Sequence, residues 1–185
     1  DWSSDVCSSD LHEEPEATRV VIAGGGNIGN YVAHTLEQRQ STAKVKIIEH
    51  SRERALSIAD TLKRTVILHG SALDQNLLLE ADIQDADTLI ALTNEDEVNI
   101  LSCVIAKKLG CKRNLSLLNN PSYPTFAHAL GIDAFVNPRQ VTISKILQHV
   151  RRGRIRGVHA LQNGAAEVIE AEALETSDLA GKTLK

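Results

Sequence analysis

Short apolar runs alternate with helical patterns from Arg19 onward, and this alternation limits the fold more than any other feature of the chain. The runs are rich in Val, Ile and Leu and are too short for helices, so they predict buried strands. Strands that recur about every 20 residues with helices between them predict βαβ units, whose crossovers give a parallel sheet with helices on both faces. The sequence therefore predicts a doubly wound α/β domain.

The expected elements follow from this pattern. Strands are expected over residues 19–23, 44–49, 65–68, 88–92, 115–118 and 134–136, and helices over 28–38, 52–62, 74–81, 95–109, around 123–130 and over 140–150. The helical spacing predicts that the second helix turns Ala55, Leu56, Ile58, Ala59 and Leu62 inward, and that the fourth does so with Val98, Leu101, Val104, Ile105 and Leu109.

The sheet accounts for only part of the chain. We expect four parts: a non-native or disordered lead-in (1–18), the α/β domain (19–138), a crossover helix with its linker (139–156), and the start of a truncated, smaller subdomain (157–185). The lead-in is polar, carries the single tryptophan and has no structural period. The crossover helix has Val141, Ile143, Ile146, Leu147 and Val150 as apolar positions, more than one sheet edge needs.

Composition excludes several classes of protein. The 185 residues include 20 basic and 24 acidic side chains, so there is no basic excess of the kind that nucleic-acid binding usually needs. No run approaches the roughly 20 apolar residues of a membrane-spanning helix, and no secretory leader is present, so we expect a cytoplasmic protein. Cys7, Cys103 and Cys111 have neither disulfide-framework nor zinc-ribbon spacing, and no metal site is expected.

The glycine-rich segment between the first strand and the first helix carries the strongest chemical signal. It fits the pattern G-x-G-x-x-G. In a Rossmann-type fold Gly24 permits the tight turn, Gly26 lets the backbone approach a pyrophosphate, and Gly29 lets the helix pack closely. Glu49 ends the second strand, where a carboxylate can accept hydrogen bonds from ribose hydroxyls. The segment predicts a site for a dinucleotide or another adenine nucleotide.

The choice of nucleotide is less constrained. Glu49 would repel a 2′-phosphate, which favours NAD(H) over NADP(H). Arg52 and Arg54 follow closely and could receive such a phosphate, but a solvated helix face explains them better. ATP or ADP would satisfy the same ribose contact, so both NAD(H) and adenine mononucleotides fit the sequence.

Polar residues after the fourth strand allow two compatible interpretations. Thr93 or Asn94 can cap the following helix, with Asp96 or Glu97 as the return arm of a capping box. The same Thr93 and Asn94 would face the nicotinamide side of a dinucleotide, because ligands of open α/β sheets lie at the carboxyl ends of the strands.

No set of residues predicts catalysis. His69, Ser71 and Asp74 are close in sequence, but a turn with a helix cap at Ser71 or Asp74 explains them better than a catalytic arrangement. We therefore expect nucleotide binding without enzymatic activity. The alternative is the cofactor-binding domain of an NAD-dependent oxidoreductase, which would need a substrate domain with a proton donor after residue 185.

Several segments together carry a specific resemblance. They are 19–29 (RVVIAGGGNIG), 47–54 (IIEHSRER), 90–100 (IALTNEDEVNI), 106–110 (AKKLG) and 137–152 (NPRQVTISKILQHVRR). These segments are similar to the RCK (regulator of potassium conductance) domains of the TrkA family, the regulatory subunits of bacterial Trk potassium uptake, and most similar to the second of the two domains. The resemblance covers about residues 19–185.

The resemblance implies a peripheral cytoplasmic regulator that is not an enzyme, binds NAD(H) or adenine nucleotides and attaches to a potassium-translocating membrane subunit. It implies that the helix over 140–150 pairs RCK domains in an oligomer. The residues that it places at the nucleotide are Gly24, Gly25, Gly26, Asn27, Ile28 and Gly29 in the glycine loop, Glu49 at the ribose, and Thr93 and Asn94 further along. Ser71 and Leu117 depart from the family, since relatives often have Asp at the first position and some have Arg at the second.

Overall fold

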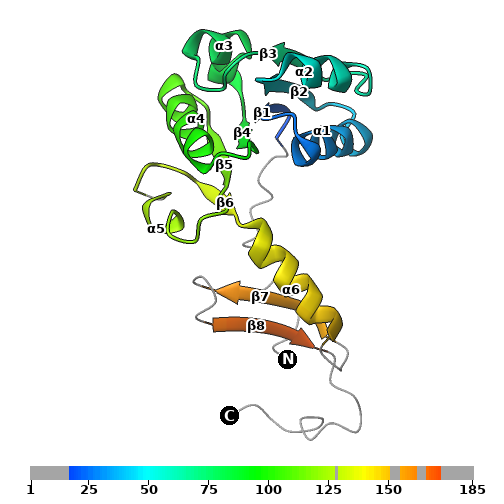
Figure 1. Ribbon diagram of the computed structural model, residues 1–185, viewed down its shortest axis with the longest axis vertical. Coiled ribbons are helices and arrows are strands. Elements are labelled where there is room, and N and C mark those ends of the chain that lie inside the picture. The colour runs from blue at the N-terminus through cyan, green and yellow to red at the C-terminus, as the bar shows by residue number, and fades with distance from the viewer. Residues whose placement is uncertain (1–16, 128, 151–154, 162–165, 172–185) are drawn as a thin grey trace, which may run out of the picture.

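The computed structural model describes residues 17–127, 129–150, 155–161 and 166–171. In this part of the chain six parallel strands form one sheet in the order β3-β2-β1-β4-β5-β6 (Figure 1). The strands are β1 (Arg19–Ala23), β2 (Lys44–Glu49), β3 (Val66–His69), β4 (Thr88–Ala91), β5 (Arg113–Leu117) and β6 (Ala134–Val136). The strand order reverses between β1 and β4, so the predicted doubly wound, Rossmann-type sheet is confirmed.

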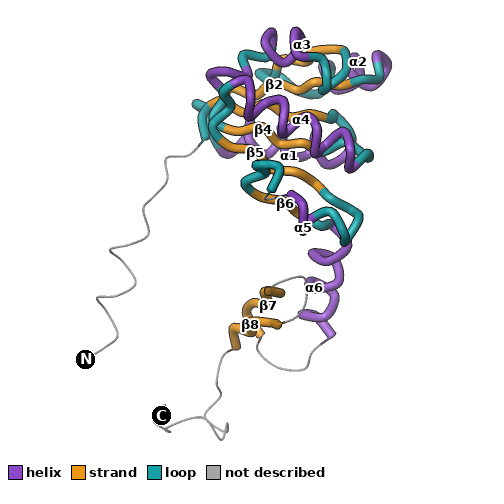
Figure 2. The backbone as a smooth tube through the Cα atoms, turned by 90° about the vertical axis from the view of Figure 1, so that its left-hand side faces the viewer, coloured by secondary structure: helices purple, strands orange, loops and turns teal. Residues whose placement is uncertain are grey.

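Helices connect the strands as predicted. They are α1 (Asn27–Arg39), α2 (Arg52–Ala59), α3 (Gln75–Glu80), α4 (Asp96–Leu109), α5 (Pro124–Ala127) and α6 (Pro138–Val150), with a 3₁₀ turn η1 (Ile83–Asp85) that the sequence pattern did not predict. Figure 2 shows α6 leading away from the sheet toward an antiparallel hairpin of β7 (Ile155–Leu161) and β8 (Ala166–Ala171). The residues outside the described part are 1–16 of the expected lead-in, 128 of the expected helix over 123–130, 151–154 of the linker, and 162–165 and 172–185 of the second subdomain.

Two apolar clusters cover the two faces of the sheet. Strand side chains alternate between them, so Val21 and Leu89 lie in one cluster and Val20 and Ile22 lie in the other. Buried residues of α3 and α4 pack in the first cluster, and buried residues of α1 and α2 pack in the second. Strand β1, which leads into the glycine loop, is thus packed on both of its faces.

The predicted inward faces of α2 and α4 need correction. Leu56 of α2 is 62% exposed, and Leu101 of α4 is 49% exposed. The buried positions of α4 are instead Asp96, Asn99, Ser102, Cys103 and Ala106, which recur at helical spacing. These side chains are small or polar, and they let the helix lie close to β4 and β5 while the larger apolar residues flank the contact.

Two helix boundaries differ from the predicted ones, and local hydrogen bonds and residue types explain both differences. Helix α2 ends at Ala59 instead of residue 62, because the N–H groups of Thr61 and Leu62 both donate to the Ile58 carbonyl in a turn. Helix α6 begins at Pro138, a residue well suited to the first helical position, and the Asn137 side chain accepts a hydrogen bond from Gln140 N–H at 3.2 Å.

Candidate nucleotide-binding site

The glycine loop lies at the carboxyl end of β1, where the strand order reverses. Gly24 has a positive φ of +103°, and a Cβ at this position would lie 2.9 Å from the backbone nitrogen of Thr93. A Cβ at Gly29 would collide with the carbonyl oxygen of Gly24. Both glycines are therefore required by the turn and by the close packing of α1 on it.

Gly26 differs from these two glycines because the space beside it is open. A Cβ at Gly26 would meet only the Nη1 atom of Arg54, at 4.0 Å. Gly26 is also the N-cap of α1 and has no capping side chain. The first N–H groups of a helix lack partners within the helix and carry the positive end of its dipole, so the start of α1 is suited to binding an anion.

Glu49 is buried and joins the glycine loop to α2. It is 5% exposed; its Oε2 accepts a hydrogen bond from Gly25 N–H at 2.7 Å, and its Oε1 accepts one from Ser51 N–H at 2.8 Å. Gly24 N–H donates to the Ile48 carbonyl at 2.8 Å. The N–H groups of Gly24 and Gly25 are thus used within the fold. Each carboxylate oxygen of Glu49 keeps a second acceptor site for a ligand hydroxyl.

Two adjoining pockets form one groove across the glycine loop. The proximal pocket has a volume of about 340 Å³ and extends toward the ends of β2 and β3, where it includes Glu49 and Ser71. The distal pocket also has a volume of about 340 Å³ and extends toward β5 and α6, where it includes Leu117 and Pro138. The residues shared by both pockets are Gly26, Arg54, Leu92, Thr93 and Asn94. Asn27 and Ile28 line the distal pocket.

Asn99 fixes the turn that holds Thr93 and Asn94 in this groove. Its Oδ1 accepts hydrogen bonds from Thr93 N–H at 2.9 Å and from Thr93 Oγ1 at 2.7 Å, and its Nδ2 donates to the carbonyls of Thr93 at 3.0 Å and Leu117 at 2.9 Å. The predicted capping box is therefore wrong. Helix α4 begins at Asp96 after an N-cap, Glu95, that makes no side-chain cap hydrogen bond, and Thr93 is held by Asn99 instead.

Asp96 connects the same turn to the segment before α6. Its carboxylate accepts hydrogen bonds from the backbone N–H groups of Asn119, at 2.9 Å, and Asn120, at 2.8 Å. Asn137 Nδ2 in turn donates to the Asn119 carbonyl at 3.3 Å. Sequence reasoning did not identify Asn99 or Asp96 as supports of the site. Asp96 and Asn99 are spaced at three-residue intervals with the buried Ser102, and this helical spacing is the sequence signal that could have placed them on the buried face of α4.

The side chains of His69, Ser71 and Asp74 hydrogen-bond to nearby backbone groups and not to one another. Asp74 caps α3 by accepting a hydrogen bond from Asn76 N–H at 2.9 Å, and Ser71 Oγ accepts one from Leu73 N–H at 3.2 Å. His69 Nε2 lies 3.1 Å from the His50 carbonyl oxygen. The predicted turn with a helix cap is confirmed.

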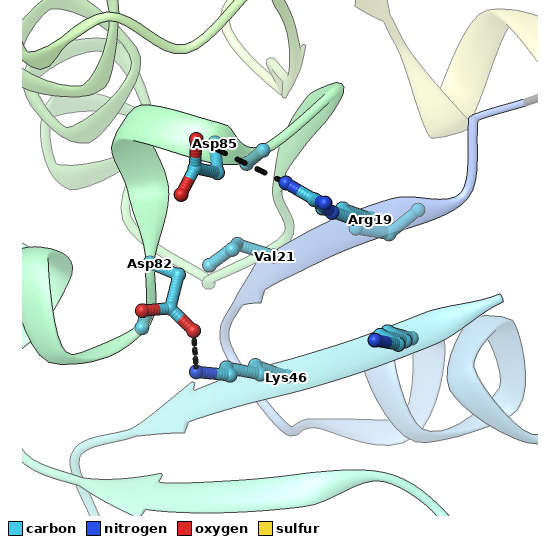
Figure 3. Close-up of a pocket in the computed structure, with 9 residues that line it drawn as sticks. Arg19, Val21, Lys46, Asp82 and Asp85 are labelled. Carbon is cyan, nitrogen blue, oxygen red and sulfur yellow. Dashed lines mark hydrogen bonds and ion pairs between the residues drawn. The ribbon is translucent and has the colours of Figure 1, made fainter.

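Another pocket, of about 260 Å³, lies at the amino ends of β1 and β2 (Figure 3). Two pairs of its charged side chains point toward one another: Lys46 Nζ is 2.6 Å from Asp82 Oδ2, and Arg19 Nη1 is 3.9 Å from Asp85 Oδ1. The hydrogen bond from Lys46 lowers the pKa of Asp82. The predicted nucleotide-binding residues all lie at the opposite edge of the sheet.

The described part of the chain has neither a cluster of metal ligands nor a membrane-spanning helix. No three His, Cys, Asp or Glu side chains of that part of the chain converge as metal ligands. None of its helices combines the length and apolar character that crossing a membrane requires. Cys103 and Cys111 are both buried and free, and burial raises the pKa of the Cys103 thiol to about 12, which keeps it protonated at neutral pH.

Comparison with known sequences identifies the domain. The model of the TrkA-N domain family matches residues 20–138. The Trk system potassium uptake protein TrkA of Azorhizobium caulinodans is 60% identical over 174 residues, which are 94% of this chain and 38% of that protein. The protein of the same name from Halomonas elongata is 47% identical over 92% of this chain and 37% of its own length. The chain thus spans little more than a third of these relatives, which are named as potassium uptake proteins and not as enzymes.

Solved structures share the fold. The TrkA-N domain of the inner membrane protein YbaL from Escherichia coli has a TM-score of 0.66 at 15% identity, over 73% of this chain and 98% of that one. The GsuK channel bound to NAD has a TM-score of 0.63 at 16% identity, over 80% of this chain and 26% of that one. The Kef CTD of Shewanella denitrificans in its AMP-bound form has a TM-score of 0.60 at 18% identity, over 71% and 79% of the two chains. The sheet order, the glycine loop and the match over residues 20–138 together show that the chain belongs to the TrkA-N family of RCK N-terminal domains.

Proposed function

We propose that the groove binds NAD(H), or ADP or ATP in its proximal part, and that this binding regulates a Trk-type potassium uptake system. The observation that carries the proposal is the continuous groove of two pockets, which crosses the open side of Gly26 and the start of α1. Binding of NAD by the GsuK channel and of AMP by the Kef CTD, which have the same fold, supports it.

The proposed ligand follows the polar groups of the groove. Its phosphates lie at the N–H groups of Gly26, Asn27 and Ile28, and its adenosine ribose lies at Glu49. Gly24, Gly25 and Gly29 shape the loop behind the phosphates, while Thr93 and Asn94 face the junction of the two pockets. A 2′-phosphate would lie beside the Glu49 carboxylate, so NADPH is disfavoured.

In the proposed regulation the protein is a peripheral cytoplasmic subunit without catalytic activity, and this chain is the second of its two RCK domains. The nucleotide can shift the balance between two arrangements of the domains only if it binds one of them more tightly than the other. A potassium-translocating membrane subunit would be open with one arrangement and closed with the other. The names of the relatives support the potassium uptake system as the setting.

Helix α6 supplies the proposed contact between RCK domains. Val141, Ile143 and Ile146 are 50%, 56% and 55% exposed on it. Leu147 and Val150, which belong to the same expected surface, have side chains outside the described part of the structure. We propose that a second RCK domain covers the exposed apolar residues.

Isothermal titration calorimetry with NADH, NADPH and ADP tests nucleotide binding. The chain should bind NADH and ADP and should bind NADPH more weakly. Gly26→Val should abolish binding, because the side chain fills the space that the phosphates need, while the open surroundings of Gly26 leave the fold intact. Ser57→Val on the exposed side of α2 is the matched control. Absence of nucleotide binding contradicts the proposal, and stronger binding of NADPH than of NADH contradicts the role of Glu49.

A further inference from the structure

The guanidinium of Arg54 lies beside the glycine loop, at the junction of the proximal and distal pockets. Its Nη1 atom is 4.0 Å from the position of a Cβ on Gly26. Among the described residues beyond the loop and its own helix, no other heavy atom comes as close to that position. Arg54 lines both pockets. Any ligand that extends from one pocket into the other must pass this side chain.

The backbone of Arg54 is tied to the same loop. Its N–H donates to Ser51 Oγ at 3.4 Å, Ser51 N–H donates to Glu49, and Glu49 accepts the hydrogen bond of Gly25 N–H. The start of α2 and the glycine loop are therefore held together, and the side chain of Arg54 extends from a fixed point toward Gly26.

The groove carries negative charge, so a bound phosphate group needs a cation near the junction of the two pockets. Glu49 and Glu95 line the proximal pocket, and Arg54 is the one Lys or Arg among the described residues that line the two pockets. Two linked phosphates would bring further negative charge. Because the N–H groups of Gly24 and Gly25 are already used, the start of α1 and the guanidinium are the groups left to neutralise it.

The guanidinium also has the chemistry for this task. It forms none of the ion pairs found in the described part of the chain. An arginine can donate two parallel hydrogen bonds to phosphate oxygens, and such charge-assisted bonds are stronger than neutral ones. We propose that Arg54 binds the pyrophosphate and makes the groove favour ligands with two linked phosphates over adenosine. This inference rests on the proposed nucleotide site.

Calorimetry on the full chain tests this with NADH, ADP, NADPH and adenosine. Arg54→Gln should weaken the binding of NADH and ADP by about tenfold or more, since it removes a charge-assisted contact. Adenosine binding should change less than about twofold on the same scale. Arg52→Gln is the matched control, because Arg52 is exposed, lies on the same helix and lines neither pocket. Arg54→Lys should recover part of the lost affinity.

The outcomes separate this inference from the proposed function. If the unsubstituted chain binds none of the four ligands, the nucleotide site is wrong and the role of Arg54 with it. If the chain binds NADH but Arg54→Gln binds it equally well, only the inference about Arg54 is wrong. A loss confined to NADPH would assign Arg54 to the 2′-phosphate and overturn the inference. An equal loss for adenosine and ADP would do the same, because it would show a structural role.

Discussion

Glu49 shows how one buried carboxylate serves both the fold and the proposed ligand. Its two oxygens hold Gly25 and Ser51, and so they set the distance between the glycine loop and α2. Loss of a buried acceptor leaves its donors without partners, which costs about 1–3 kcal/mol for each group. Substitutions of Glu49 therefore report on stability as well as on ribose binding, and Gly26 is the better residue for testing the ligand alone.

Glu37 provides the clearest pH dependence at the scale of a residue. It lies on α1 and accepts hydrogen bonds from the N–H groups of Lys63, Arg64 and Thr65 and from the Thr65 hydroxyl. Partial burial raises the pKa of Glu37, but these hydrogen bonds outweigh it, with that from Arg64 the largest, and lower the pKa from 4.5 to about 2. Because the pKa of Glu37 is lower in the folded chain than in the unfolded chain, its carboxylate stabilises the fold at pH values above 4.5. This stabilisation is lost as the pH falls from 4.5 toward about 2.

We expect Glu37→Gln to reduce the free energy of unfolding by about 1–2 kcal/mol at pH 7, at the lower end for bonds to a charged group because solvent reaches the carboxylate. Urea unfolding at several pH values measures this. The difference in the free energy of unfolding between the unsubstituted chain and Glu37→Gln should shrink as the pH falls from 4.5 toward about 2. A difference that stays constant down to pH 2 would show that the charge of Glu37 does not matter.

At the scale of elements, α6 connects the sheet to the hairpin and exposes apolar residues. Ile143 and Ile146 lie one helical turn apart and are both more than half exposed. An interface that covers them would be of the order of 800 Å² for each partner if it is of standard size.

Ile146→Asp should weaken that interface by several kcal/mol, because it places an unpaired charge in a buried patch. The exposed position in the single chain means that the fold should remain stable. Light scattering with size-exclusion chromatography should show a smaller assembly, while Lys108→Glu, at an exposed position of α4, keeps the original one. An unchanged assembly of Ile146→Asp would rule out α6 as the contact.

Local signals explain which elements could be predicted from the sequence. The six strands of the parallel sheet, the glycine loop and the cap at Asp74 depend on short runs of residues, and these were predicted. The buried face of α4 was not, because the close approach of the helix to the sheet selects small residues and leaves Leu101 exposed. Asn99 was missed for a related reason: its partners, Thr93 and Leu117, lie on two different strand ends that only the folded sheet brings together.

At the scale of the whole molecule, the test is potassium uptake. Cells that lack their own regulator should grow at limiting potassium when they receive the full-length protein. The same protein with Gly26→Val should still associate with the membrane but lose the nucleotide dependence of uptake, because a coupling of about 1–3 kcal/mol requires a bound ligand. Ser57→Val again serves as the control. If potassium uptake responds to nucleotide equally with Gly26→Val and with Ser57→Val, nucleotide regulation does not depend on binding in this groove.

The far wall of the distal pocket belongs partly to the start of α6, because Pro138 is the first residue of that helix and also lines the pocket. Asn119, beside it, is held by Asp96 and by Asn137. In the proposed binding mode the groove would distinguish its ligands by length. ADP would end at the phosphates, whereas the second nucleoside of NADH would extend toward Pro138. Hydrogen exchange of the α6 amides should slow with NADH and stay unchanged with ADP, and equal protection by both would contradict this. A longer ligand would then brace the helix that leads to the neighbouring domain, and a shorter one would occupy the same site without touching it.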